Sequence, residues 1–244
     1  MFKKLLCFIS FVLINSAVFC QNSLEDADRY YEQKNYGSAL KIYTGFNSDE
    51  FNATRLYNLG YSYYGTSQYC KAKQIFEKGI QKFNNSQSSV TLAYIFEKGL
   101  CGNTVDLKKA FENYLSASES GNRNGAYNLA VFYRDGIYIK KDLCRAKDLY
   151  FKAYQKGHIG AKIAYAAGLT KGYCGVTDNK KAFELLAVID ENENDFSSSS
   201  YYSTLGWLYE TGKGGELNRT KAYYYYKKGC ELFGNKYCCD KMNK

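Results

Sequence analysis

An alanine recurs at nearly regular intervals along this chain, and this periodicity constrains the fold more than any other feature of the sequence. It is the third residue of six similar phrases: GSALKIY, CKAKQIF, KKAFENY, CRAKDLY, KKAFELL and TKAYYYY, which place it at Ala39, Ala72, Ala110, Ala146, Ala182 and Ala222. Successive alanines are 33, 38, 36, 36 and 40 residues apart. Self-similarity at such a period is typical of repeat architectures in which each unit is one supersecondary element.

The residues around each alanine predict a helix. A large side chain follows four positions later, on the same helical face, at Tyr43, Phe76, Tyr114, Tyr150, Leu186 and Tyr226. Four positions before the alanine stand Asn35, Gln68, Asp106, Asp142, Asp178 and Asn218. All of these except Gln68 are residue types favoured at a helix N-cap, because their side-chain oxygens accept a free backbone N–H. This column therefore predicts where the helix begins.

A second column of small residues predicts another helix before each of these. Its members are Ala27, Gly60, Ala93, Ala130, Ala166 and Gly206, and the last four carry a glycine six positions later, at Gly99, Gly136, Gly172 and Gly212. Glycine there suits a residue that caps the helix C-terminus in the left-handed backbone conformation. The sequence thus predicts helix–turn–helix units at about 24–46, 53–83, 88–120, 124–157, 160–190 and 199–233, followed by a C-terminal cap at 234–244. The chain has 26 tyrosines and no proline, which favours long helices packed through aromatic rings.

Two segments carry a resemblance to a known family. LAVFYRDGIYIKKDLCRAKDLYFKAYQKG and LGWLYETGKGGELNRTKAYYYYKKG resemble SEL-one-like repeats, with Ala, Leu-Gly and Tyr on the first helix, a Gly-rich turn, and then Asp, Lys-Ala and Tyr on the second. In the first two units the two small-residue columns are only 12 residues apart, which resembles the shorter tetratricopeptide form. The resemblance implies an all-α fold: a right-handed α/α superhelical solenoid of about six units.

The N-terminus predicts export. MFKKLLCFISFVLINSAVFC, residues 1–20, has two lysines, a short apolar run and small residues, which is the layout of a secretory signal peptide. Cleavage after Cys20 would leave a single solenoid domain at 21–244, in the periplasm or secreted; lipid attachment at Cys20 is the alternative. Loss of Lys3 and Lys4 lowers the formal charge from +9 to +7, spread along the chain. We expect no nucleic-acid partner and no transmembrane segment.

Seven cysteines remain after such a cleavage, and export favours disulfides. Cys70 and Cys144 each open the second helix of a unit, whereas Cys101 and Cys174 each lie in the turn of the following unit. In an antiparallel stack these positions meet at one edge, which predicts the bridges Cys70–Cys101 and Cys144–Cys174. In the tail, a resemblance to Helicobacter cysteine-rich members of the repeat family implies Cys230–Cys238. Cys239 is an equal alternative partner, because the sequence does not separate vicinal cysteines.

Catalytic and metal motifs are sparse. The single histidine, His158, follows a turn glycine and is expected at the surface; no Cys-x-x-Cys pair occurs, and we expect no metal and no cofactor. Some cysteine-rich members of the resembled family are linked to penicillin binding or β-lactamase activity, which makes a cell-wall-related enzyme the alternative function. The chain's notable SxxK runs from Ser38 to Lys41, but it contains the packing residue Ala39, and no SDN or KTG motif follows. We therefore predict no catalytic residue.

The remaining prediction is a binding surface. Solenoids of the resembled kind present their first helices along a concave groove that takes a peptide or protein partner. The positions that this implies are Tyr57, Tyr61, Tyr64, Tyr94, Glu97, Tyr127, Arg134, Trp207 and Glu210. Tyr, Trp and Arg often carry binding energy at interfaces, although such aromatics also pack between repeats. We expect a non-catalytic, monomeric interaction scaffold.

Overall fold

Helices make up the architecture in the computed structural model, which describes residues 23–189 and 198–242. Within these ranges there are thirteen α-helices, two short 3-10 helices and no strand. The bounds are α1 (Leu24–Glu32), α2 (Tyr36–Tyr43), η1 (Ser48–Glu50), α3 (Ala53–Gly65), α4 (Tyr69–Phe83), α5 (Ser86–Lys98), α6 (Leu107–Glu119), α7 (Arg123–Asp135), α8 (Leu143–Gln155), α9 (Ile159–Thr170), η2 (Tyr173–Gly175), α10 (Asn179–Ala187), α11 (Ser199–Thr211), α12 (Arg219–Phe233) and α13 (Lys236–Met242). The expected signal peptide, and Cys20 with it, lies outside the described residues.

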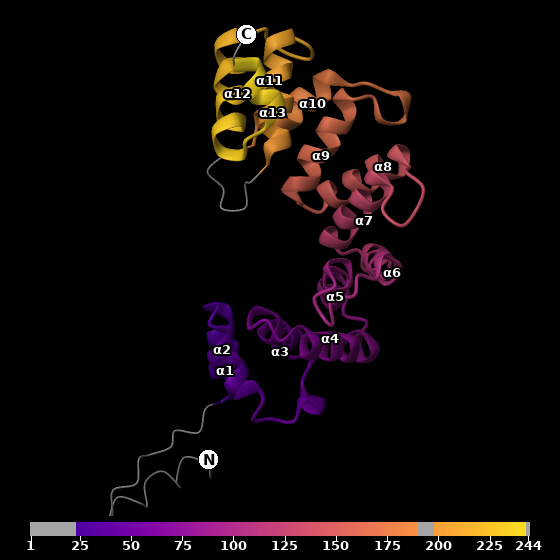
Figure 1. Cartoon of the computed structure of the whole chain (residues 1–244), viewed down its shortest axis with the longest axis vertical. Coiled ribbons are helices and arrows are strands. Elements are labelled where there is room, and N and C mark those ends of the chain that lie inside the picture. Colours follow the sequence, from indigo (N-terminus) through magenta and orange to yellow (C-terminus); the bar gives the residue numbers. More distant parts are fainter. Residues whose placement is uncertain (1–22, 190–197, 243–244) are drawn as a thin grey trace, which may run out of the picture.

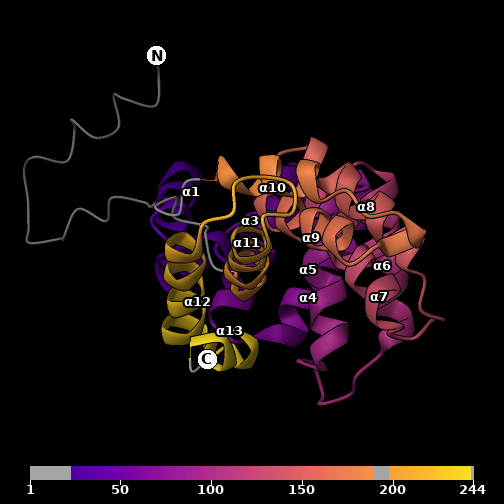
Figure 2. The same cartoon turned by 90° about the horizontal axis from the view of Figure 1, so that it is seen from above.

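The helices pair in chain order, from α1 with α2 to α11 with α12, and successive pairs stack into a curved solenoid (Figure 1). Figures 1 and 2 both place α1 and α12 on one side of the molecule and α6 and α8 on the other, so the stack bends into an arc. First helices of successive units also contact one another, as α1 does α3, α3 does α5 and α5 does α7. The predicted all-α solenoid of six helix pairs is confirmed.

The two small-residue columns lie where helix backbones approach each other. Ala72, Ala110 and their equivalents in the other units are at most 3% exposed. A Cβ added to Gly60 would stand 2.6 Å from the ring of Phe76, and one added to Gly206 would stand 2.7 Å from the ring of Tyr226. In these two units the large residue of the second helix thus fills the space that the glycine of the first helix leaves open.

The predicted N-caps are confirmed in five of the six units. The side chains of Asn35, Asp106, Asp142, Asp178 and Asn218 each accept a hydrogen bond from the backbone N–H three residues later. Gln68 precedes α4 without such a bond. Gly99, Gly136 and Gly212 end α5, α7 and α11 in the left-handed conformation. This conformation sets the direction in which the backbone leaves each helix and enters the following turn.

Candidate functional site

A groove lined mainly by tyrosines lies in the N-terminal half of the solenoid and is called here the tyrosine groove. It has a volume of about 440 Å³ and is lined by Tyr31, Tyr36, Tyr57, Tyr61, Tyr64, Gln87, Val90, Thr91, Tyr94, Asn124 and Asn128. Four of the nine predicted binding residues, Tyr57, Tyr61, Tyr64 and Tyr94, therefore share one surface. Tyr31 and Tyr36, from α1 and α2, were missed by the sequence reasoning.

The rings of the tyrosine groove form one connected cluster. Tyr61 is central: its ring centroid lies 6.1 Å from that of Tyr31, 5.5 Å from that of Tyr36 and 5.4 Å from that of Tyr64. Tyr94, at the edge, is 40% exposed. Burial and the neighbouring tyrosines raise the pKa of Tyr64 to about 12. This hydroxyl is therefore neutral at physiological pH, and the groove lining includes no charged residue.

A second cavity, called here the Arg134 pocket, lies among α7, α8 and α9. It has a volume of about 340 Å³, and its lining includes Tyr127, Arg134, Asp135, Lys141, Tyr150, Lys171 and Tyr173. The Arg134 guanidinium donates to both carboxylate oxygens of Asp135, at 2.8 and 2.6 Å. This hydrogen bonding holds the pKa of Asp135 below its ordinary value. The structure thus brings the predicted residues Tyr127 and Arg134 together, but apart from the tyrosine groove.

Trp207 lies in neither of these cavities. It lines a third one, of about 500 Å³, together with Thr170, Lys171, Ser203, Thr204, Asn235 and Tyr237. The ammonium of Lys213 stands 5.2 Å from the Trp207 ring centroid, a cation–π arrangement that covers part of the indole.

Glu97 and Glu210 each accept a hydrogen bond from a buried tyrosine within their own unit. The hydroxyl of Tyr114 donates to Glu97 at 2.9 Å, and that of Tyr226 donates to Glu210 at 2.8 Å. In the first unit, Tyr43 donates to Asp28 at 2.5 Å. A carboxylate on the first helix thus accepts from a buried tyrosine of the second in three units. The sequence signal was present, because Glu97 and Glu210 both stand four residues beyond the small residue of their first helix.

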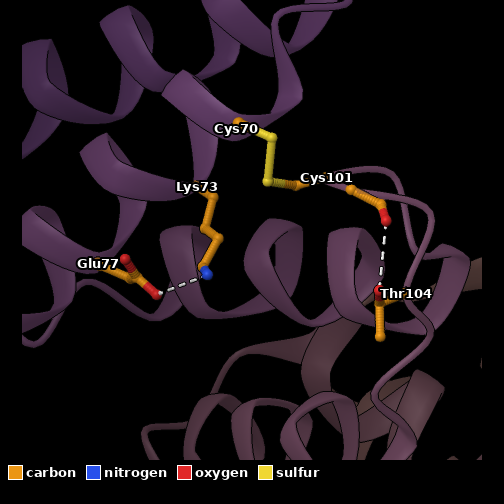
Figure 3. Close-up of a disulfide and its surroundings, with 6 residues drawn as sticks. Cys70, Lys73, Glu77, Cys101 and Thr104 are labelled. Carbon is orange, nitrogen blue, oxygen red and sulfur yellow. Dashed lines mark hydrogen bonds and ion pairs between the residues drawn. A yellow bond between two sulfur atoms is a disulfide. The ribbon is translucent and has the colours of Figure 1, made fainter.

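Two disulfides join neighbouring units as the repeat alignment predicts. Cys70, in the first turn of α4, is bonded to Cys101, in the turn after α5, with their Cα atoms 4.8 Å apart. Figure 3 shows this bridge beside Lys73, whose ammonium lies 3.8 Å from the Glu77 carboxylate. Cys144, on α8, is bonded to Cys174, in η2, with their Cα atoms 4.7 Å apart. Each bridge ties a second helix to the turn of the next unit.

The expected bridge Cys230–Cys238 is wrong, and the alternative is found instead. Cys230 is bonded to Cys239, with their Cα atoms 4.9 Å apart, and Cys238 is a buried free thiol. Successive residues of a helix point about 100° apart, so only one of two vicinal cysteines on α13 can face Cys230. Cys238 faces inward against Gly229, where an added Cβ would lie 2.6 Å from its sulfur. Burial raises the pKa of the Cys238 thiol to about 11.

His158 is only partly at the surface, in contrast to the expectation. Its Nδ1 accepts the backbone N–H of Ala161 at 3.1 Å, so the imidazole caps α9. The ring stacks on Tyr127 at a centroid distance of 4.4 Å. Burial and the nearby positive charge of Arg123 lower the pKa of His158 below its ordinary value. The described ranges 23–189 and 198–242 contain no group of three or more His, Cys, Asp or Glu side chains placed to hold a metal ion.

Comparison with known proteins agrees with this architecture. The Sel1 repeat family matches residues 91–122, 124–158 and 204–232. A sel1-like repeat-containing protein of Acanthamoeba polyphaga mimivirus is 29% identical over 135 residues, which cover 53% of this chain and 24% of that protein. The chain thus spans about a quarter of the length of this curated relative. No helix of the described residues has the length and apolar character that crossing a bilayer requires.

Solved structures share the fold. A Sel1 repeat protein from Oxalobacter formigenes superposes with a TM-score of 0.69 at 20% identity, covering 86% of this chain and 85% of that one. A protective antigen present in uropathogenic Escherichia coli strains, which displays an SLR fold, superposes with a TM-score of 0.59 at 20% identity, covering 91% of this chain and 56% of that one. Sel1 repeats generally serve as scaffolds for protein–protein interaction. Three segments of this chain thus match Sel1 repeats, and its solenoid is similar in fold to those of solved Sel1 repeat proteins.

Proposed function

We propose that this protein is an exported, non-catalytic scaffold that binds an extended peptide segment of a protein partner in the tyrosine groove. The observation that carries the proposal is the gathering of six tyrosines from α1, α2, α3 and α5 around one groove of about 440 Å³. Tyrosine is enriched at binding hot spots because it combines a large apolar ring with a hydroxyl and loses little conformational entropy.

The polar residues of the groove indicate the kind of segment that fits. Gln87, Asn124 and Asn128 add side-chain amides beside the rings. An amide both donates and accepts hydrogen bonds, so these groups suit the N–H and C=O groups of an extended main chain. Since the lining is uncharged, we expect the bound segment to present apolar or aromatic side chains to the tyrosines.

The three disulfides support export. Bridges of this kind persist in oxidising compartments and are rare in a reducing cytosol. Intact-mass measurement of the protein purified from its native host tests this part: an N-terminus at Gln21 supports secretion, and a lipid on Cys20 would point to a membrane anchor. Covalent labelling by a penicillin, lost in Ser38→Ala, would contradict the non-catalytic role and favour the cell-wall-related enzyme.

Binding in the tyrosine groove is tested by peptide selection followed by mutation. Peptides selected from a displayed library on the protein, with its bridges intact, are measured by calorimetry against Tyr94→Ala and Tyr223→Ala. Tyr94 is 40% exposed in the groove, and Tyr223 is a matched control, 52% exposed on α12. We expect Tyr94→Ala to weaken binding roughly tenfold and Tyr223→Ala to leave it unchanged. Equal affinities for both variants would contradict the proposed groove.

A further inference from the structure

One repeat unit lacks the internal carboxylate that its buried tyrosine would be expected to use. In the third and sixth units, the residue four beyond the small residue of the first helix is Glu97 or Glu210, and each accepts from the tyrosine of the second helix. The equivalent residue in the fourth unit is Arg134, and the equivalent tyrosine is Tyr150. A guanidinium only donates hydrogen bonds, so Arg134 cannot replace the glutamate as an acceptor.

The consequence is visible at the Tyr150 hydroxyl. Tyr150 is 0% exposed, and its hydroxyl has no hydrogen-bond partner among the described residues. Buried hydroxyl groups without a partner are uncommon in native proteins because they lose their bonds to water without replacement. Burial raises the pKa of Tyr150, and the nearby charge of Arg134 opposes this only in part, so the hydroxyl is a neutral donor at physiological pH.

The other units show that the carboxylate accompanies the buried hydroxyl. In the second and fifth units the second helix carries Phe76 or Leu186, which have no hydroxyl, and the first helix carries Tyr64 or Thr170 at the position of the glutamates. The fourth unit is therefore the exception among the six: it keeps the buried donor and has a cation where an acceptor is expected. Tyr150 is also one of the residues that line the Arg134 pocket.

The charges of the Arg134 pocket favour an anion. Its lining contains three cations, Arg134, Lys141 and Lys171, and one carboxylate, Asp135. Asp135 engages two of the five N–H donors of the Arg134 guanidinium, so three remain. None of the ion pairs within 23–189 and 198–242 includes Lys141 or Lys171. The pocket therefore offers several charge-assisted donors, which is the chemistry that recognises a carboxylate.

We propose that the Arg134 pocket binds the side-chain carboxylate of an aspartate or glutamate carried by a partner peptide, which accepts from Arg134 and from the Tyr150 hydroxyl. Residue 134 occupies the same position in its unit as Glu97 and Glu210 in theirs, and Arg134 and Tyr150 line the same cavity, so a single bound carboxylate can lie between them. This second site rests on the proposed function only in taking a peptide as the carrier of the acid.

The experiment is an NMR titration of the intact, disulfide-bonded protein, following the backbone amide signals of α7 and α8 in every variant and the side-chain Nε–H signal of Arg134 where that residue is present. The probe is the peptide Gly-Gly-Glu-Gly-Gly, acetylated and amidated so that the glutamate is its one charge. We expect saturable binding, and binding at least tenfold weaker for the glutamine analogue. An acetylated pentaglycine with a free C-terminus distinguishes the source of the acid; tighter binding of that peptide would overturn the side-chain assignment.

Variants separate this site from a general attraction to positive charge. We expect Tyr150→Phe to weaken binding of the glutamate peptide roughly tenfold, and Arg134→Glu, which restores the carboxylate of the other units, to abolish it. Arg134→Gln gives the same test if the glutamate variant fails to fold. Tyr114→Phe, at a hydroxyl already bonded to Glu97, is the matched control and should bind normally. The proposal is overturned if the glutamate peptide fails to bind, or binds equally to all four variants. Tyr94→Ala should leave this titration unchanged, so a failure here is distinguishable from failure of the tyrosine groove.

Discussion

Replacing single buried tyrosines by phenylalanine should have opposite effects in two equivalent units. In Tyr114→Phe the lost hydrogen bond is one to a charged acceptor, and bonds of that kind contribute about 1.5–3 kcal/mol. Glu97 keeps Lys98 as a partner at 2.5 Å, and its side chain is 21% exposed, so we expect the lower end, a loss of about 1.5 kcal/mol. In Tyr150→Phe no bond within the described residues is lost, and removal of an unsatisfied buried hydroxyl should change the free energy of unfolding by about 0 to +1 kcal/mol.

Because solenoid units unfold with some independence, the assay should report each unit locally. Amide hydrogen exchange, with the bridges intact, measures the opening free energies of α6 in Tyr114→Phe and of α8 in Tyr150→Phe. We expect α6 to lose protection by about tenfold, and α8 to keep or gain protection. The packing is matched, since Tyr114 is 1% exposed and Tyr150 is 0% exposed. Equal loss of protection in the two variants would refute the assignment of Tyr150 as an unsatisfied donor.

Three further predictions concern the bridges and the helix cap. Cys239→Ala should free its partner thiol on α12, detected by alkylation without reductant, and cost about 2.7 kcal/mol of stability, whereas Cys238→Ala should leave every bridge intact. Replacing Cys144 and Cys174 together by alanine should cost about 3.7 kcal/mol in denaturant unfolding, since that bridge closes a longer loop; a smaller cost than for Cys239→Ala would count against the loop-entropy argument. The folded-state pKa of His158 is lowered, so the unfolded chain binds the proton first. The stability from this neutral cap is therefore complete above about pH 6.5 and is lost as the pH falls below it; His158→Asn should keep the cap and remove this dependence, and an unchanged pH profile would contradict it.

The repeat units could be predicted because their determinants are local. An N-cap such as Asp142 and a packing residue such as Ala146 lie about one helical turn apart. Helix geometry fixes their relative positions, so their separation along the sequence is enough to predict their roles. The alignment of units then placed Cys144 beside Cys174, because both positions recur with the period. Gln68 is the one N-cap position among the six that lacks a favoured residue type, and it precedes α4 without a side-chain hydrogen bond. The helix still forms, with Ala72 and Phe76 packed on its buried face.

The small-residue columns describe one repeat unit at a time, so they could not predict contacts that depend on the curvature of the whole stack. Tyr31 and Tyr36 belong to the first unit, and they meet Tyr61 of the second only because the arc brings α1, α2 and α3 together. The spacing of residues within one unit does not determine the rotation between that unit and the next. The predicted pairing of Cys230 with Cys238 was wrong for a related reason. Which of Cys238 and Cys239 faces Cys230 depends on the angle between α12 and α13, and the side chains of adjacent residues on a helix point about 100° apart.

The position four beyond the small residue of the first helix shows why a site in a repeat protein is best sought by comparing units with each other. A side chain at that position can reach the tyrosine of the second helix, so it either accepts from the tyrosine hydroxyl, as Glu97 and Glu210 do, or leaves that hydroxyl without an acceptor. A rule that assigns every such residue to the groove gives Glu97 and Arg134 the same role. The buried hydroxyl separates them: where the acceptor is internal the pair is closed, and where Arg134 stands instead, Tyr150 keeps a donor for which the described fold supplies no acceptor.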